Sequence, residues 1–200
     1  MPDSAHYFDR DPAVPEQRRT ITVRLAGRDT DVETAPGVFS PGHVDLGTRV
    51  LLRTVGDRAL AGDVLDLGCG WGPLALSMAM RSPEATVWGL DVNARALGLL
   101  RDNAARLGLR GIRPVTPEQV PAELTFTAIW SNPPIRIGKE ALHALLERWL
   151  SRLTDDGVAH LVVQRHLGAD SLQRWITESL CMPARRVASA KGFRVLEVAR

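Results

Sequence analysis

The fold of this chain is decided by the stretch Val64-Leu65-Asp66-Leu67-Gly68-Cys69-Gly70-Trp71-Gly72. Its apolar first half is typical of a buried parallel strand, and a helical pattern opens just behind its three glycines, at Leu74-Ala75-Leu76. Glycine adopts positive φ and lets a ligand approach the main chain closely, and a helix N-terminus offers unpaired N–H groups. The stretch therefore predicts a nucleotide-type cofactor site at the carboxyl end of a first strand. A tight turn with a purely structural role is the alternative.

An acidic residue ends the next predicted strand. Residues 85–91 read Ala-Thr-Val-Trp-Gly-Leu-Asp, a short buried strand that closes on Asp91, and Asn93 is a suitable N-cap for the following helix. A carboxylate there can accept hydrogen bonds from both hydroxyls of a ribose, so Asp91 would fix an adenosine against the glycine turn. The alternative is that Asp91 caps the helix beside Asn93.

Two consecutive prolines follow a third buried strand. Residues 126–131 form this strand, and Asn132-Pro133-Pro134-Ile135 comes directly after it. Neither proline can donate to a strand ladder, so the strand must end there. The stiff loop would hold the Asn132 side chain at the carboxyl end of the strand, the edge where ligands of open α/β sheets bind.

These three features, in this order, resemble the class I S-adenosylmethionine-dependent methyltransferases. Asp66-x-Gly68-x-Gly70-x-Gly72 is similar to the cofactor loop of that class, whereas a dinucleotide dehydrogenase more often shows G-x-G-x-x-G. Asn132-Pro133-Pro134 is similar to the N/D-P-P-Y/F signature of members that methylate an exocyclic or amide nitrogen. The resemblance implies S-adenosyl-L-methionine as the cofactor and no metal.

A finer resemblance covers residues 36–198 and points to the 16S-type, small-subunit ribosomal RNA guanine-N2 methyltransferases. The stretches that carry it are Pro36-Gly37-Val38-Phe39-Ser40, Asp45-Leu46-Gly47, Val50-Leu51-Leu52 and the closing Gly192-Phe193-Arg194-Val195-Leu196. The chain departs from that family at two points. Many members carry a second, degenerate methyltransferase-like domain ahead of the catalytic one, for which this chain has no room. Ile135 stands where an aromatic residue, able to stack on a base, is usual.

The resemblance also implies roles for individual residues. The side-chain carbonyl of Asn132 and the backbone carbonyl of Pro133 can accept the N–H groups of guanine's exocyclic amine and aim its lone pair at the methyl group. Substrate contacts are expected from Phe39, Pro134, Ile135 and Arg136. Cofactor contacts are expected from Asp66, Gly68, Cys69, Gly70, Gly72, Asp91, Val92, Thr116 and Asn132. Trp130 is expected in the core instead, because of strand parity.

Strands and helices alternate along most of the chain, which predicts a doubly wound, mostly parallel Rossmann-like α/β sheet. Residues 20–34 alternate around a turn and predict a small N-terminal β-hairpin. Two strands without a helix between them, near residues 185–189 and 194–199, predict a C-terminal antiparallel hairpin. We therefore divide the chain into a tail and hairpin extension, 1–35, and a methyltransferase domain, 36–200. Residues 1–17 show no periodicity and are expected to be mobile or loosely draped over the body.

The remaining elements follow from apolar spacing. Helices are expected over residues 45–55, 73–80, 94–107, 138–153 and 169–180, and strands over residues 63–67, 86–91, 112–115, 126–131 and 158–163. In the helix over 138–153, His143 shares the polar side with Glu140 and Glu147 and is interpreted as a solvated helix residue.

Composition sets outer limits on the function. Two hundred residues, of which 44% are hydrophobic, suit one α/β domain with a sizeable core. The first residues lack the regions of a signal peptide, and no apolar run approaches the roughly 18 residues of a membrane span, so a cytoplasmic enzyme is expected. Two cysteines exclude a disulfide scaffold and are not spaced as a metal pair. A net charge of +2 does not by itself indicate nucleic acid, and a monomer or weak dimer is expected.

Three functions remain open at this point. The first is methyl transfer to the exocyclic N2 of a guanine in ribosomal RNA, with RNA or the small ribosomal subunit as partner. The second is methyl transfer to a protein amide or a small amine, because Asn-Pro-Pro serves those reactions too. The third is a non-catalytic binding protein with a vestigial cofactor fold, against which the intact glycines, Asp91 and Asn132 argue.

Overall fold

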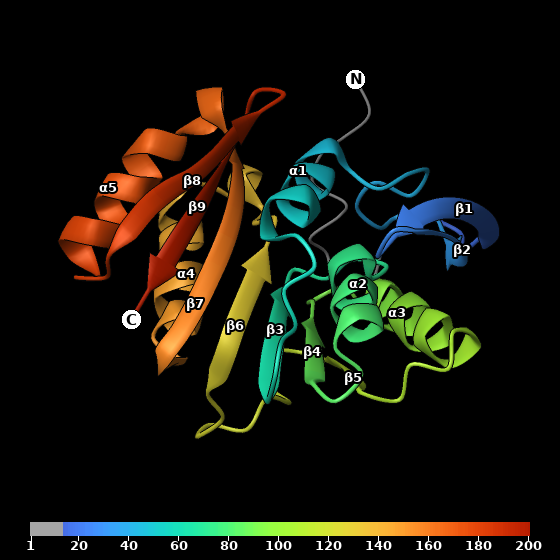
Figure 1. The fold of residues 1–200 in the computed structure, drawn as a ribbon. Helices are drawn as coiled ribbons and strands as arrows, with labels where there is room; N and C mark the ends of the chain where they lie inside the picture. The colour runs from blue at the N-terminus through green and yellow to red at the C-terminus, as the bar shows by residue number, and fades with distance from the viewer. Residues whose placement is uncertain (1–13) are drawn as a thin grey trace.

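A seven-stranded sheet forms the centre of the molecule (Figure 1). The computed structural model describes residues 14–200, so the prediction for residues 1–13 lies outside it. The strand order is β5-β4-β3-β6-β7-β9-β8; the first five strands of this order are parallel, and β9 is antiparallel to both of its neighbours. The strands span Asp63–Leu67 (β3), Thr86–Leu90 (β4), Ile112–Val115 (β5), Phe126–Ser131 (β6), Leu153–Gln164 (β7), Ala184–Ala190 (β8) and Phe193–Ala199 (β9). The predicted doubly wound sheet with a C-terminal antiparallel hairpin is confirmed.

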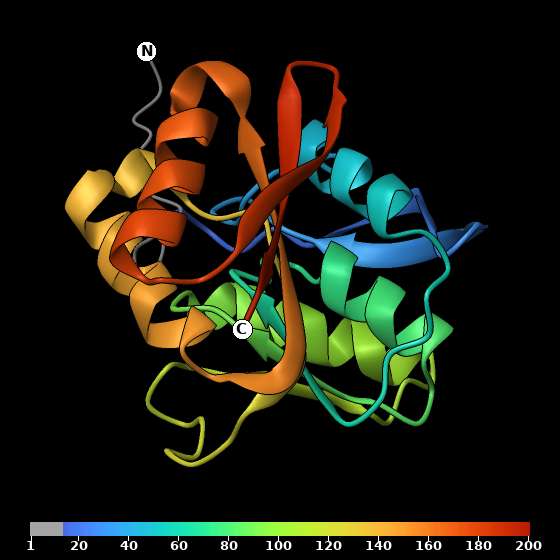
Figure 2. The ribbon, with the colours of Figure 1, turned by 60° about the vertical axis from the view of Figure 1, so that its left-hand side comes forward.

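Helices cover both faces of the sheet (Figures 1 and 2). Alternate strand residues point into two separate apolar clusters, as Val64 and Leu65 of β3 do. One face packs against α1 (Leu46–Val55), α2 (Pro73–Arg81) and α3 (Ala94–Arg106). The other packs against α4 (Lys139–Leu150) and α5 (Ala169–Ser179). Two short 3-10 turns, η1 (Ile135–Ile137) and η2 (Arg165–Leu167), follow the carboxyl ends of β6 and β7.

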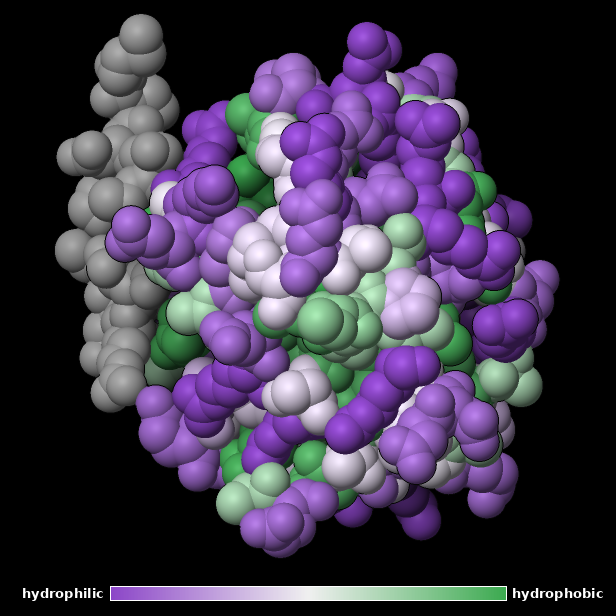
Figure 3. Space-filling model, turned by 90° about the vertical axis from the view of Figure 1, so that its left-hand side faces the viewer, coloured by the Kyte–Doolittle hydropathy of each residue, from purple (hydrophilic) through white to green (hydrophobic). Residues whose placement is uncertain are grey.

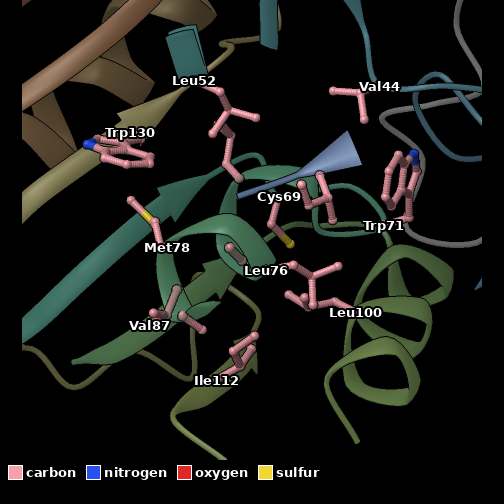
Figure 4. Packing of buried hydrophobic residues seen from close by; sticks show 14 of the residues in the cluster. Val44, Leu52, Cys69, Trp71, Leu76, Met78, Val87, Leu100, Ile112 and Trp130 are labelled. Atoms are coloured by element: carbon pink, nitrogen blue, oxygen red, sulfur yellow. The ribbon is translucent and has the colours of Figure 1, made fainter. Parts of the chain in front are cut away.

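The core beneath α1, α2 and α3 is closely packed (Figure 4). Leu100 of α3 and Leu76 of α2 are both fully buried in it, and Cys69 lies there between the glycine turn and the sheet. Trp130 is 2% exposed and belongs to the same cluster, which confirms the expectation from strand parity.

The predicted N-terminal hairpin is confirmed as β1 (Arg19–Leu25) and β2 (Arg28–Thr34). It is anchored on α3 by Asn103, whose side chain accepts from the Glu33 N–H at 2.6 Å and donates to the Glu33 carbonyl at 2.9 Å. The adjoining residues 14–17, expected to be loosely draped, also contact the body. The Val14 carbonyl accepts from Arg95 of α3 at 2.8 Å.

Two predictions about the second half of the chain are wrong in part. Helix α4 ends at Leu150, three residues early, because β7 already begins at Leu153. The register between β7 and β6 shifts between Phe126 and Ala128 of β6, so the stretch of β7 before Val158 is a bulge. The backbone folds tightly there, since a Cβ on Gly157 would lie 2.9 Å from the Thr154 backbone. His143, interpreted as a solvated helix residue and not a catalyst, lies outside the cleft but is only half-exposed, because its ring stacks on Trp175 of α5 with centroids 3.6 Å apart.

On the side that carries α5 and β8, hydrophilic residues predominate and the apolar areas between them are small (Figure 3). Within residues 14–200, no helix is long and apolar enough to cross a bilayer.

Candidate active site

A cleft of about 530 Å³ opens at the carboxyl ends of the parallel strands. The chain runs from β3 outward to β4 and β5 and then returns to β6 on the other side of β3, so β3 and β6 flank the switch point of the sheet. Open α/β sheets bind ligands at this place, because the loops of neighbouring strands diverge there. The volume lies within the usual range for small-molecule sites.

The glycine turn forms one end of the cleft. Gly68 and Gly70 have φ of +83° and +53°, and a Cβ on either would meet no atom within 4 Å. Their backbone therefore faces open space, in a conformation that other residues rarely adopt. Between them, the Cys69 side chain turns inward, and burial raises the pKa of its thiol.

Gly72 has a different role in the turn. Its φ is +106°, and a Cβ there would lie 2.5 Å from Leu100 Cδ1. A Cβ on Gly89 of β4 would meet the same Leu100 side chain at 2.3 Å, so this leucine is wedged between two glycines (its place in the core is seen in Figure 4). Gly72 thus lets α3 pack closely against the turn and the sheet, and it does not line the cleft.

Asp91 stands at the end of β4 and lines the cleft beside the glycine turn. Its carboxylate accepts from the Gly70 N–H and from the Asn93 N–H, both at 2.9 Å. The N-cap of α3 is Asn93, whose side chain accepts from Ala96 N–H, so the interpretation of Asp91 as a helix cap is wrong. Burial raises the pKa of the Asp91 carboxyl, and the N–H donors oppose that shift. Each carboxylate oxygen keeps a further acceptor site for a ligand.

Asp66 lies beneath the same turn and is fully buried. Its Oδ2 accepts from the Ala75 N–H at 2.8 Å, whereas its Oδ1 has no hydrogen-bond partner. Burial raises the pKa of this carboxyl to about 8. An unpartnered buried oxygen is costly, so a donor supplied by a ligand would be favourable here.

Asn132 follows β6 directly and lies beside the glycine turn, because Ser131 of β6 pairs with Leu67 of β3. It lines both the cleft and a small cavity next to the turn. The part of the cleft that Asn132 and the loop after it line is here called the acceptor end. Its Nδ2 donates to Asp45 Oδ2 at 2.9 Å and to Thr48 Oγ1 at 3.2 Å. Both partners belong to the start of α1, more than 80 residues earlier in the chain. The amide nitrogen is thereby occupied, and the carbonyl oxygen Oδ1 is the end of the side chain that stays available.

The two prolines shape the loop behind Asn132. The Ile135 N–H donates to the Pro133 carbonyl at 2.8 Å, and Pro134 between them has φ −74° and ψ 75°, which is an inverse γ-turn. One lone pair of the Pro133 oxygen is thus used inside the turn and one remains. The Ile135 side chain lines the cleft and also packs on the α4 side of the core.

Residues 36–44, here called the cover segment, form part of the cleft wall through Phe39, Ser40, Pro41 and His43. Trp71 Nε1 donates to the Ser40 carbonyl at 3.1 Å, and Asn93 Nδ2 donates to the Gly37 carbonyl at 2.8 Å. Trp71 belongs to the glycine turn and Asn93 caps α3, so the cover segment is fixed by residues that adjoin the predicted cofactor end. Phe39 on this segment is 47% exposed although it lines the cleft.

The structure brings most of the predicted site residues together. The cleft is lined by Phe39, Gly68, Gly70, Asp91, Val92, Asn132, Pro133, Pro134, Ile135 and Arg136. Asp66 and Cys69 line a small cavity that Gly68, Gly70 and Asn132 line as well. Gly72 and Thr116 lie outside both linings, and their contacts with a ligand stay predictions. Within residues 14–200, no cluster of side chains suits a metal ion.

Sequence reasoning missed further lining residues: Ser40, His43, Asp45, Gln164, Leu167 and Phe193. For Asp45 a signal was present, because an acidic residue ahead of Gly47 and Thr48 is typical of an N-cap. Its reach toward Asn132 could not be seen from the sequence. Gln164 and Phe193 pair with each other across β7 and β9, and nothing local in the sequence marks that pair as part of a site.

Comparison with known proteins places the chain in a family. The model of the methyltransferase small domain matches residues 29–197. The uncharacterized protein YbxB of Bacillus subtilis is 33% identical over 97% of this chain and 98% of its own length. The ribosomal RNA small subunit methyltransferase C of Ectopseudomonas mendocina is 33% identical over 96% of this chain, which spans 59% of that protein.

A solved structure extends the likeness to the fold. A Thermus thermophilus 16S rRNA N2 methyltransferase, in complex with AdoMet and guanosine, matches with a TM-score of 0.81 and 25% identity, over 94% of this chain and 52% of that one. The chain therefore spans nearly all of the Bacillus protein but little more than half of these two methyltransferases. It belongs to the methyltransferase small domain family and has the fold of a class I S-adenosylmethionine-dependent methyltransferase.

Proposed function

We propose that this protein transfers a methyl group from S-adenosyl-L-methionine to the exocyclic N2 of a guanine in ribosomal RNA, of the small-subunit type. One observation carries the proposal: the glycine turn with Asp91 and the Asn132-Pro133-Pro134 loop line the same cleft. A cofactor at the first end would present its reactive group to an acceptor held at the second end.

Three features of the first end fit this cofactor. The open backbone at Gly68 and Gly70 would leave room for the methionine part of the cofactor, between its sulfur and its amino and carboxyl groups. The unpartnered Asp66 Oδ1 would accept from an ammonium group, and the Asp91 carboxylate, with Val92 beside it, would accept from ribose hydroxyls. When bound, S-adenosyl-L-methionine supplies an electrophilic methyl group on a sulfonium.

At the second end, the protein would align the nucleophile. The exocyclic amine of guanine is a weak nucleophile because its lone pair is delocalised into the ring. Asn132 Oδ1 and the remaining lone pair of the Pro133 carbonyl would accept its two N–H groups and turn the lone pair toward the cofactor end. Alignment of this kind lowers the barrier by several kcal/mol, and neither acceptor has to act as a base.

The base itself would be covered by apolar side chains. Phe39 of the cover segment and Ile135 of η1 both line the cleft, as do Pro134 and Arg136. Phe39 would supply the stacking surface that the family usually takes from the position of Ile135. The amine lies in the minor groove of a duplex, so the target guanine would be unpaired or flipped.

The substrate class is supported by two of the three relatives, the Ectopseudomonas and Thermus proteins, which are ribosomal RNA methyltransferases. Because this chain spans only about half the length of these two proteins, its own RNA contacts are part of the proposal. We infer a protein that acts in the cytoplasm on ribosomal RNA or the small subunit, as a monomer or weak dimer.

The test is the identity of the methylated product. The purified chain is incubated with methyl-labelled S-adenosyl-L-methionine and either small-subunit ribosomal RNA or intact small subunits lacking the modification. Nuclease digestion and mass spectrometry should then yield N2-methylguanosine, and Asn132→Ala should form it more slowly, by about 10²-fold or more. Label that appears only in ribosomal protein or in a small amine would replace the proposal by methyl transfer to those acceptors.

A further inference from the structure

We propose that Asp45 is a positioning residue, which together with Thr48 fixes the amide of Asn132 so that its carbonyl oxygen faces the target amine. The inference rests on the proposed function, in which Asn132 Oδ1 accepts from that amine. It adds a role for the first turn of α1, a segment that otherwise only packs on the sheet.

The chemistry of the pair allows one orientation of the amide. A carboxylate can only accept hydrogen bonds, so the group of Asn132 that lies 2.9 Å from Asp45 Oδ2 must be the NH₂ group. The opposite orientation would bring two oxygens to that distance without a proton between them. Thr48 Oγ1, at 3.2 Å, adds a second acceptor on the same nitrogen. The carbonyl is thereby directed away from α1.

Asp45 is itself held firmly. As the N-cap of α1, its Oδ2 accepts from the Gly47 N–H at 2.8 Å and the Thr48 N–H at 3.3 Å. Gly47 allows the ring of Phe193 to approach, since a Cβ there would lie 2.8 Å from Phe193 Cε1. The start of α1 therefore packs tightly against Phe193 of β9 and also binds the Asn132 side chain. Asp45 Oδ2 both caps the helix and accepts from the Asn132 amide.

A positioning role and a role as a base differ in whether Asp45 needs its negative charge. In the proposed transfer the N–C bond forms as the methyl–sulfur bond breaks, and the methylated amine then releases its proton to water, so no base is required of Asp45. A neutral side chain with an oxygen at the same place would anchor the Asn132 NH₂ group equally well. Asparagine offers such an oxygen and is as good an N-cap as aspartate.

The experiment compares three substitutions in the full-length protein. Asp45→Ser keeps a good N-cap, but its hydroxyl is one bond shorter and cannot reach Asn132. We expect kcat for N2 methylation to fall by about 10–30-fold, with the Kd of S-adenosyl-L-methionine within about threefold. Asp45→Asn should restore most of that kcat. Asp31→Ser, the same change on the exposed hairpin, is the matched control and should leave kcat unchanged.

A second measurement does not depend on the substrate. The Asn132 side-chain NH₂ signals in an NMR spectrum are assigned by their loss in Asn132→Asp, and their exchange with solvent is followed. We expect slow exchange in the wild type and in Asp45→Asn, and fast exchange in Asp45→Ser. Thr48→Val, which removes only the hydroxyl acceptor, should give an intermediate rate.

The outcomes are distinct. Full kcat and slow exchange in a folded Asp45→Ser would overturn the inference and leave Asp45 as a helix cap only. An equal loss of kcat in Asp45→Asn and Asp45→Ser would also overturn it, in favour of a role for the negative charge. If the wild type does not methylate guanine, the proposed function fails, while the exchange rates still decide whether Asp45 orients the amide.

Discussion

The two ends of the cleft are built in opposite ways. At the cofactor end, the open surface belongs to the backbone of Gly68 and Gly70, and the residues that shape it lie within about 25 positions of one another. At the acceptor end, the surface belongs to side chains from the cover segment, the Asn132 loop, the end of β7 and the start of β9. Its orientation depends on the start of α1, 87 residues away from Asn132.

This difference teaches where tolerance to substitution should lie. A site formed by backbone atoms depends on φ angles that only glycine adopts easily, so replacing such a glycine should strain the turn or block the site. A side-chain site depends on the fixed direction of a few polar atoms, so its loss shows in the rate of reaction. Affinity should therefore be governed by the first end and turnover by the second.

The largest effect is expected for Asn132→Ala, which removes the acceptor without touching the glycine turn. Methyl transfer should fall by about 10²-fold or more, because misplacement of the nucleophile alone is that costly. The Kd of S-adenosyl-L-methionine should stay within about threefold of the wild type, since Asn132 is one expected cofactor contact among many and the glycine turn and Asp91 are left intact. Calorimetry gives the Kd and single-turnover kinetics give the rate.

A joint loss of affinity and rate would break the comparison, because Asn132 would then mainly shape the cofactor pocket. Retained activity would remove Asn132 from the mechanism.

The same contrast explains how much could be predicted from the sequence. The cofactor end is contiguous in the chain, so strand, glycine turn and acidic residue were visible as one pattern, and the sheet followed from the alternation of strands and helices. Asn132 was visible because two prolines can only stand where a strand ends. Its anchor Asp45 and its neighbours Gln164 and Phe193 were not, since they meet it only through packing of α1 and β9 on the sheet.

The bulge in β7 was hidden for a related reason. Asp156-Gly157 is typical of a turn, and only the pairing with β6 shows that the strand continues through it. Stacking of His143 on Trp175 likewise depends on how α4 and α5 lie side by side, which helical spacing does not specify.

Asp91→Ala tests the affinity side of the comparison. The loss of a carboxylate that accepts ligand hydroxyls should weaken binding of S-adenosyl-L-methionine by roughly 1.5–3 kcal/mol, or about 10–150-fold in Kd. The matched control is Asp102→Ala on α3, an exposed aspartate that pairs with Arg18 and lies outside the cleft. Calorimetric titration of both variants checks the expectation, and an equal Kd for the two would assign Asp91 a purely structural role.

Gly72→Ala separates packing from cofactor contact within the turn. Its Cβ would collide with Leu100, which Gly89 already confines from the other side, so we expect a loss of roughly 1.5–2.5 kcal/mol in the free energy of unfolding. Gly108→Ala is the matched control, because Gly108 also has positive φ but open space around its Cβ. Strain alone should cost it about 1 kcal/mol. Urea unfolding measures both, and similar losses would mean that Leu100 moves aside freely.

The smallest effect is expected from pH, and it too belongs to the cofactor end. Burial raises the pKa of Asp66 from 3.8 to about 8, so between these values the folded protein binds a proton that the unfolded chain has released. The stability that this proton contributes is fully present below pH 3.8 and is lost as the pH rises through 8. Asparagine imitates the protonated acid at all pH values. Between pH 6.5 and 8.5 the free energy of unfolding of the wild type should therefore fall by about 1–2 kcal/mol more than that of Asp66→Asn.

Bound ligand sharpens this last expectation. If an ammonium group of the cofactor pairs with the unpartnered Asp66 Oδ1, it favours the charged carboxylate and lowers the pKa of Asp66. Saturating S-adenosylhomocysteine should then reduce the difference in pH slope between wild type and Asp66→Asn. Parallel pH curves without ligand would show that Asp66 is ionised in the folded protein across this range. A difference that ligand leaves untouched would place the ammonium group elsewhere and confine Asp66 to holding the N-terminus of α2 through Ala75.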